Sequence, residues 1–206
     1  SKGSFLPPVS LPQRMWASSH IIFHKALEVG VFTKKTSTIK NVILKKNAVA
    51  SPLIFVEINH DYEQNSNLCI QDKQTLVYRE SSPYKKLKPE HVEDSTYAYK
   101  VVPTSVLLFR YSALTFNSHR IHYDTRYCKK IEGYPGLVVH GPLMATMLMN
   151  LAQAKNSAPL KEFKFRALAP SFVDENLNLI LQNDEARELE VRSDDGSIIM
   201  SAQAEF

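Results

Sequence analysis

The chain has 206 residues, of which 44% are hydrophobic and 22% are charged, and its formal net charge is +4. This is the composition of a globular protein with enough apolar material for a sizeable core. No apolar run approaches the roughly 20 residues of a membrane span. No segment combines dense Lys and Arg with aromatic residues as nucleic-acid binders do. These observations exclude a membrane-spanning protein and a nucleic-acid-binding protein.

Charge is distributed unevenly along the chain, with basic residues in the first half and acidic residues in the last quarter. A basic surface attracts an anionic partner, such as a nucleotide phosphate or an acidic carrier protein, but an ordinary solvated face has the same composition. Cys69 and Cys128 have no metal-binding spacing, and we expect neither a metal nor a cofactor. The basic residues are Lys34, Lys35, Lys40, Lys45, Lys46, Arg79, Lys85, Lys86 and Lys88.

The first half of the chain is rich in β-strand patterns. Residues 5–13 contain three prolines and predict an extended lead-in. Four strand-like segments follow, and the polar turn EQNSN separates the last two. We therefore expect an antiparallel meander over residues 1–90, ending in a proline-rich and charged linker at about 80–95 that leads to a second half, 91–206. The strand-like segments are 16–30, 36–47, 52–62 and 68–80.

The second half combines strands with one apolar helix. Residues 98–117 are expected to form a strand that leads into a polar motif. Residues 142–155 predict a helix, because Pro142 fits a first turn and the interior is nearly apolar all round. Alternating segments at 162–170, 176–182 and 197–206 predict strands that wrap this helix. The fold class is therefore α+β.

The segment ALTFNSHRIHYD, residues 113–124, places several polar side chains after an apolar run. Such side chains are costly to bury unless they are paired, so they are expected at a cleft or on a loop. Histidine is the side chain best suited to proton transfer near neutral pH. The motif therefore predicts an active site containing Asn117, His119, Arg120, His122 and Asp124.

The segment LVVHGPLMATML, residues 137–148, leads into the predicted helix. The first N–H groups of a helix have no intrahelical acceptor, and the helix dipole adds positive potential there. Glycine also lets a ligand approach the backbone closely. The Gly141 N–H is therefore expected to bind a thioester oxygen that becomes enolate-like during a reaction.

These motifs resemble the MaoC-like hydratase/dehydratase family of the hotdog fold. The branch with the most similar motifs contains the fungal mitochondrial 3-hydroxyacyl-thioester dehydratases and the mesaconyl-CoA-type hydratases. The resemblance rests on YSALTFNSHRIHYD and YPGLVVHGPL at 111–143, on a proline-rich segment at 5–16, and on VYRE at 77–80. It spans nearly the whole chain and implies a double hotdog. From the resemblance we expect an incomplete first hotdog over residues 1–90, because the family normally has a strand and a helix before this proline-rich segment.

The resemblance implies reversible dehydration of (3R)-3-hydroxyacyl thioesters by a hydro-lyase. His122 would be the base, the Gly141 N–H the oxyanion donor, and Asn117 the group that positions the hydroxyl or water. Asn117 stands where the wider family has an acidic residue, and an amide cannot act as a base. The remaining expected site residues bind substrate: His119, Arg120, Val139 and His140.

The implied substrate is an acyl chain on acyl carrier protein, in mitochondrial type II fatty-acid synthesis in the matrix. The resemblance also allows a hydratase of CoA esters, of the mesaconyl-CoA or enoyl-CoA type. Two other classes stay open: a hotdog thioesterase, for which Asp124 is the available carboxylate, and a non-catalytic thioester-binding protein. Two fused hotdogs can mimic the usual hotdog dimer, so both a monomer and a homodimer are compatible with the sequence.

Overall fold

The structure is a computed structural model that describes residues 5–45, 51–81, 84–85, 97–182 and 187–206. The chain forms two compact units. The first comprises Ser1–Ser81 with Lys161–Lys164, and the second comprises Ser82–Leu160 with Phe165–Phe206. The boundary expected at residues 90 and 91, and most of the expected linker, lie outside the described residues. Among the described residues, no helix is both long and apolar enough to cross a membrane.

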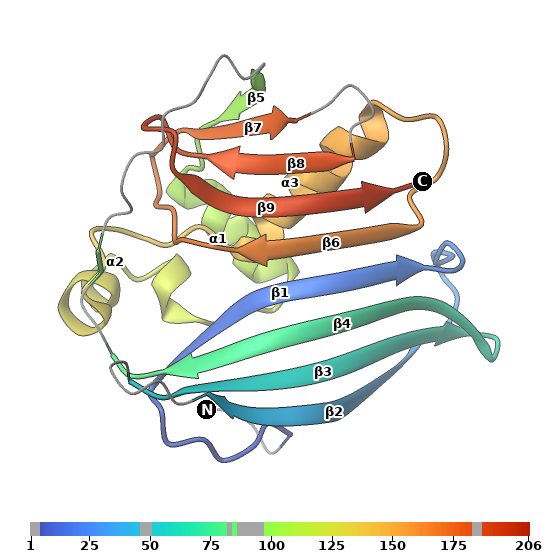
Figure 1. The fold of residues 1–206 in the computed structure, drawn as a ribbon, viewed down its shortest axis with the longest axis horizontal. Coiled ribbons are helices and arrows are strands. Elements are labelled where there is room, and N and C mark those ends of the chain that lie inside the picture. Colours follow the sequence, from blue (N-terminus) through green and yellow to red (C-terminus); the bar gives the residue numbers. More distant parts are fainter. Residues whose placement is uncertain (1–4, 46–50, 82–83, 86–96, 183–186) are drawn as a thin grey trace. The chain divides into compact units, whose positions relative to one another are not determined.

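The first unit is built on four antiparallel strands in the order β2-β3-β4-β1, which lie side by side in Figure 1. Asn65 and Ser66 join β3 to β4 with φ angles of 49° and 62°. Two positive φ values are the signature of the type I′ turn, whose twist matches that of a hairpin. The predicted antiparallel meander is therefore confirmed for β2, β3 and β4, whereas β1 pairs with β4 and not with β2. The strands are β1 Gln13–Phe23, β2 Lys34–Lys45, β3 Leu53–Gln64 and β4 Asn67–Arg79.

One face of this sheet carries an apolar cluster at one end and polar side chains at the other. The proline-rich lead-in contributes Leu11 to the cluster, which also contains Val56 and Tyr78. Further along the same face of β3 and β4, His60 and Asp72 are opposite each other and buried. Because side chains alternate along a strand, the apolar cluster and the polar pair share one surface.

The second unit is an antiparallel sheet packed on the helix α3, Gly141–Ala154. Its strands follow the order β6-β9-β8-β7-β5, and α3 lies against β8 and β9 (Figure 1). The strands are β5 Tyr97–Val101, β6 Glu162–Ala167, β7 Leu177–Leu181, β8 Glu188–Arg192 and β9 Ile198–Glu205. The first part of β6 belongs to the first unit.

The predicted central helix is confirmed almost to the residue. It was expected over 142–155 and occupies Gly141–Ala154, with Pro142 near its start. Proline costs nothing there, since its missing N–H would have had no intrahelical partner. The helix is held by burial of its apolar side chains Leu143, Met144, Ala145, Leu148, Leu151 and Ala152.

The expected strand over 98–117 is wrong beyond Val101. The helix α1 occupies Ser105–Leu114, and the Leu107 N–H donates to the Thr104 side chain, 3.2 Å away, at the helix start. A Thr in this position satisfies one of the free donors of the first turn. Only Leu108 and Ser112 of α1 are buried, which is one residue per turn. The run SVLLFRYSAL imitates a buried strand in sequence, although it is a helix with a single buried stripe.

Three short helical segments connect α1 to the strand-like stretch before α3. They are η1 Arg120–His122, α2 Thr125–Tyr127 and η2 Cys128–Glu132. The polar motif therefore follows a helix rather than a strand, and part of it folds into η1. The expectation that residues 142–155 form the one helix of the second half is also wrong.

Candidate active site

The side chain of His122 is buried and held in one orientation. It is 7% exposed, and its Nδ1 lies 2.7 Å from the carbonyl oxygen of Val138. Because a carbonyl only accepts, Nδ1 carries the hydrogen and Nε2 carries the lone pair. Val138 is itself fixed, since its N–H donates to the Ile121 carbonyl at 2.9 Å and it forms an isolated bridge with Phe172. The arrangement leaves Nε2 as the proton-accepting atom.

Burial lowers the pKa of His122 to about 4. The hydrogen bond to Val138 opposes this effect, and the nearby His119 adds to it. Removal of water penalises the charged imidazolium more than the neutral ring. His122 is therefore neutral at neutral pH, which is the form that can take a proton from a substrate.

His140 packs directly against His122. Its ring is stacked on that of His122, with centroids 3.6 Å apart and planes inclined by 16°. His140 is fully buried, its Nε2 is 2.8 Å from the Ser112 hydroxyl, and the ring of Tyr111 meets it edge-on at 4.9 Å. Burial lowers the pKa of His140 to about 3, so this ring is neutral as well.

Gly141 begins α3 directly after His140. The first residue of a helix has no intrahelical acceptor for its N–H, and Pro142 has no N–H at all. The N–H groups of Leu143 and Met144 donate to the His140 carbonyl, at 3.1 Å and 3.2 Å. Gly141 therefore supplies a backbone N–H without an intrahelical acceptor at the positive end of α3, next to the residue whose ring stacks on His122.

His119 contacts His122 directly, and Asn117 is linked to His119 by a hydrogen bond. The ring of His119 meets that of His122 edge-on, with centroids 5.7 Å apart. Asn117 is half-buried, and its Oδ1 accepts a hydrogen bond of 3.0 Å from the His119 N–H. The structure thus brings His119, His122 and His140 together, and ties Asn117 to them through the backbone of His119.

Arg120 and Asp124 form a local pair. The Arg120 guanidinium donates to the Asp124 carboxylate at 2.7 Å and lies over the Tyr127 ring at 4.3 Å. The other Asp124 oxygen accepts from the Tyr127 N–H at 2.9 Å and caps α2. These hydrogen bonds, that from Tyr127 first, hold the pKa of Asp124 below its usual value. Both groups therefore make contacts that stabilise the loop after the base.

Val139 is part of the buried framework around His122. It is 2% exposed, and its N–H donates to the Ser171 carbonyl at 2.9 Å. Sequence reasoning missed three contributors: the Ser112 hydroxyl, the Val138 carbonyl and the partner segment at Ser171 and Phe172. A polar residue four positions after Leu108 on the buried stripe of α1 was the available signal for Ser112.

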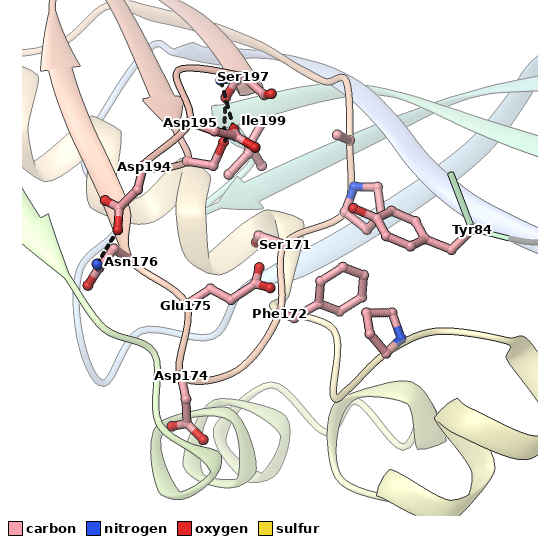
Figure 2. Close-up of a pocket in the computed structure, with 14 residues that line it drawn as sticks. Tyr84, Ser171, Phe172, Asp174, Glu175, Asn176, Asp194, Asp195, Ser197 and Ile199 are labelled. Atoms are coloured by element: carbon pink, nitrogen blue, oxygen red, sulfur yellow. Dashed lines mark hydrogen bonds between the residues drawn. The ribbon is translucent and has the colours of Figure 1, made fainter. Parts of the chain in front are cut away.

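A cavity of about 560 Å³ lies in the second unit beside this framework, as Figure 2 shows. Tyr84 and Phe172, whose rings meet edge-on at 5.0 Å, form one side, and Asp194 with its partner Asn176 lies on the other. Neither His122 nor Gly141 lines this cavity or the neighbouring one of about 410 Å³. The carboxylates that line the larger cavity disfavour a phosphate-bearing ligand there. They are Asp174, Glu175, Asp194 and Asp195.

No group of three or more His, Cys, Asp or Glu side chains with a metal-binding arrangement occurs in the part of the chain that the structure describes. Cys69 and Cys128 are both buried and free. The site as a whole is thus a neutral, buried imidazole beside a helix N-terminus, an arrangement that suits proton transfer next to an oxyanion donor.

Comparison with known proteins identifies relatives of this chain. The model of the hydroxyacyl-thioester dehydratase type 2 family matches residues 1–173. The chain is 42% identical over 212 residues to a mesaconyl-C(4)-CoA hydratase of Chloroflexus aurantiacus, covering all of this chain and 74% of the relative. It is 29% identical over 200 residues to a mitochondrial hydroxyacyl-thioester dehydratase type 2 of Schizosaccharomyces pombe, covering 84% of this chain and 66% of that protein.

Solved structures show the same fold. The crystal structure of HtdX from Mycobacterium tuberculosis matches with a TM-score of 0.75 at 15% identity, covering 93% of this chain and 76% of that one. A second M. tuberculosis protein, described as a double hotdog, matches with a TM-score of 0.62 at 11% identity, covering 94% and 74%. The predicted double-hotdog α+β fold is confirmed.

The family match and the fold agree with the resemblance to MaoC-like hydratases that the motif at 111–143 carries. Relatives in this family are named dehydratases and hydratases, which are hydro-lyases. The chain therefore belongs to the hydroxyacyl-thioester dehydratase type 2 family.

Proposed function

We propose that this chain interconverts (3R)-3-hydroxyacyl and trans-2-enoyl thioesters, with His122 as the single general base. The observation that carries the proposal is the 2.7 Å hydrogen bond from His122 Nδ1 to the Val138 carbonyl. It places the lone pair on Nε2 of a buried ring that is neutral at working pH. A general base needs this orientation and this protonation state.

In the dehydration direction, His122 Nε2 takes the proton from C2 of the substrate. The electron pair of that C–H bond moves onto the thioester carbonyl, and the Gly141 N–H stabilises the resulting enolate oxygen. The enolate electrons then form the C2–C3 double bond as the C3–O bond breaks. The leaving hydroxyl takes the proton from His122 and departs as water, which returns the ring to its neutral form.

Asn117 is proposed to position the hydroxyl or water through its side-chain amide, because its Oδ1 is already held by the His119 N–H. His119, which meets the base edge-on, is the nearest candidate for a substrate contact at the rim of the site, as it is exposed. Arg120 is also exposed, and its contact with substrate would compete with its pair to Asp124. Val139 is buried and is proposed to shape the acyl site by packing.

The carrier of the acyl group separates two candidate functions. The 42% identity to a protein named mesaconyl-C(4)-CoA hydratase favours a CoA ester. Similarity to a mitochondrial dehydratase of S. pombe favours a chain on acyl carrier protein, in the mitochondrial matrix and in fatty-acid synthesis. The exposed lysines of β2 would suit an acidic carrier protein. They are Lys34, Lys35, Lys40 and Lys45.

The structure gives a physical argument against a thioesterase. A thioesterase of this type needs a free carboxylate, and both oxygens of Asp124 are engaged, one by Arg120 and the other by the Tyr127 N–H. A non-catalytic thioester-binding protein would have no need for a His122 ring that is held in one orientation and kept neutral.

The test is a hydration assay that follows loss of the enoyl-thioester absorbance. Crotonyl and mesaconyl groups are offered on CoA, and crotonyl is also offered on acyl carrier protein. A rate at least tenfold higher on one carrier assigns the carrier. Release of free thiol without hydration would replace the proposal by a thioesterase. Binding of crotonyl-CoA without turnover would replace it by the non-catalytic alternative.

A further inference from the structure

His140 has an environment that packing alone does not explain. The ring is fully buried, its Nε2 is bound to the Ser112 hydroxyl at 2.8 Å, and Tyr111 packs against its edge. Its Nδ1 is buried and has no hydrogen-bond partner. An unpaired buried polar atom costs about 1–3 kcal/mol, and an apolar side chain of the same size would avoid this cost. The nitrogen therefore calls for a functional explanation.

The position of His140 at the start of α3 indicates which nitrogen carries the hydrogen. His140 is the residue that caps the N-terminal end of this helix. The positive potential at a helix N-terminus favours a lone pair over an N–H. A buried N–H without an acceptor is also rarer than an acceptor without a donor. Nε2–H therefore donates to Ser112 Oγ, and Nδ1 carries an unshared lone pair.

The lone pair belongs to a ring stacked on His122 at a centroid distance of 3.6 Å. When His122 takes the substrate proton, it becomes positively charged in a site where burial and the nearby His119 penalise that charge. Polar groups that are fixed in advance toward developing charge lower the barrier without reorganisation. His119, whose ring meets that of His122 edge-on at 5.7 Å, is the other titratable group at the base.

We propose that His140 is a positioning residue for the base: Ser112 holds its neutral ring flat against His122, and the negative partial charge of its unprotonated Nδ1 in the stacked ring stabilises the imidazolium that forms there during turnover. The inference rests on the proposed role of His122 and goes beyond it, since His140 acts through the base. It also explains how one histidine can serve where a carboxylate is missing, because Asn117 cannot offset positive charge.

Two substitutions of His140 distinguish the roles of its two ring nitrogens. An amide reaches the place of Nδ1 in His140→Asn and the place of Nε2 in His140→Gln. The Asn variant keeps an acceptor near His122, whereas the Gln variant keeps only the bond to Ser112. His140→Phe preserves the flat ring and removes both nitrogens. Tyr111→Phe is the matched control, because it alters another aromatic neighbour of the same ring and leaves His140 intact.

We expect kcat for crotonyl-CoA hydration to fall by about 10- to 100-fold in His140→Phe and His140→Gln, with KM within about twofold, since the lost interaction exists only when charge develops. His140→Asn should recover a substantial part of kcat. Tyr111→Phe should stay near the wild-type rate. Ring ¹⁵N shifts of His140 in the wild-type protein should show hydrogen on Nε2 and none on Nδ1.

Wild-type kcat in a folded His140→Phe variant, equal losses in the Asn and Gln variants, or a hydrogen on Nδ1 would each overturn the inference. The wild-type protein is assayed first. If it is inactive on every thioester, the proposed function fails and the inference fails with it. If it is active and His140→Phe is unimpaired, only the role of His140 is lost.

Discussion

The substitution His122→Asn removes the proposed base while preserving its structural contact. In the folded protein, His122 Nδ1–H donates to the Val138 carbonyl at 2.7 Å. The amide of an asparagine reaches the place of Nδ1 and can make the same donation, but nothing replaces Nε2. The variant therefore separates the chemical role of the ring from its contribution to the loop between η1 and α3.

The expected loss of rate follows from the removal of a general base. A positioned general base contributes about 10²- to 10⁴-fold to rate, so kcat for crotonyl-CoA hydration should fall by that factor. Stability should change little in His122→Asn. In His122→Ala the Val138 carbonyl loses its buried donor, which costs about 1–3 kcal/mol, and the missing ring leaves a cavity above His140. The alanine variant should therefore be both inactive and less stable.

The assay pairs initial hydration rates, read at the enoyl-thioester absorbance, with thermal unfolding followed by circular dichroism. A folded His122→Asn protein that keeps more than a tenth of wild-type kcat would refute the assignment of His122 as base. Tyr123→Phe is the matched control, because Tyr123 is the next residue in the chain and its hydroxyl binds the Ser118 carbonyl at the surface. Its rate should equal that of the wild-type protein.

The remaining predictions concern the pH dependence of stability and activity, Gly141 at the start of α3, and the carboxylate of Asp124. The pKa of His122 is lowered from 6.5 to about 4, so between these pH values the unfolded chain binds more protons than the folded protein. The free energy of unfolding should therefore fall as pH drops from 6.5 through 4. Urea unfolding should show a shallower fall in His122→Asn than in the wild-type protein. Activity should need the neutral base, so the acidic limb of the kcat/KM profile should lie near pH 4, and a limb near 6.5 would contradict the buried ring. Gly141→Ala should fold normally, since the added Cβ meets Met200 Cε at an ordinary 3.9 Å, yet it should lose about tenfold in kcat/KM by crowding the oxyanion donor; unchanged kinetics would remove Gly141 from the site. Asp124→Asn should keep the α2 cap and full hydration activity. If the wild-type protein mainly releases free thiol and Asp124→Asn loses that release, the protein is a thioesterase.

Much of the fold was readable from local pattern. The four strands of the first unit and the apolar helix were predicted because alternation and helical periodicity report burial of a face directly. The helix α1 was missed for the same reason. Its apolar run resembles a buried strand, and only the burial of Leu108 and Ser112 within the second unit shows that one stripe of a helix is buried.

The candidate site also combines features that the local sequence sets with features that only the tertiary structure sets. The sequence alone determined which residue types are present, placed His122 and Gly141 in one block, and identified the start of α3, because these depend on short-range spacing. The tertiary structure decided which atoms meet. The stack of His122 on His140 joins residues 18 positions apart, and Ser112 reaches His140 across 28. The protonation of a histidine depends on burial and on such neighbours, which only the folded chain supplies.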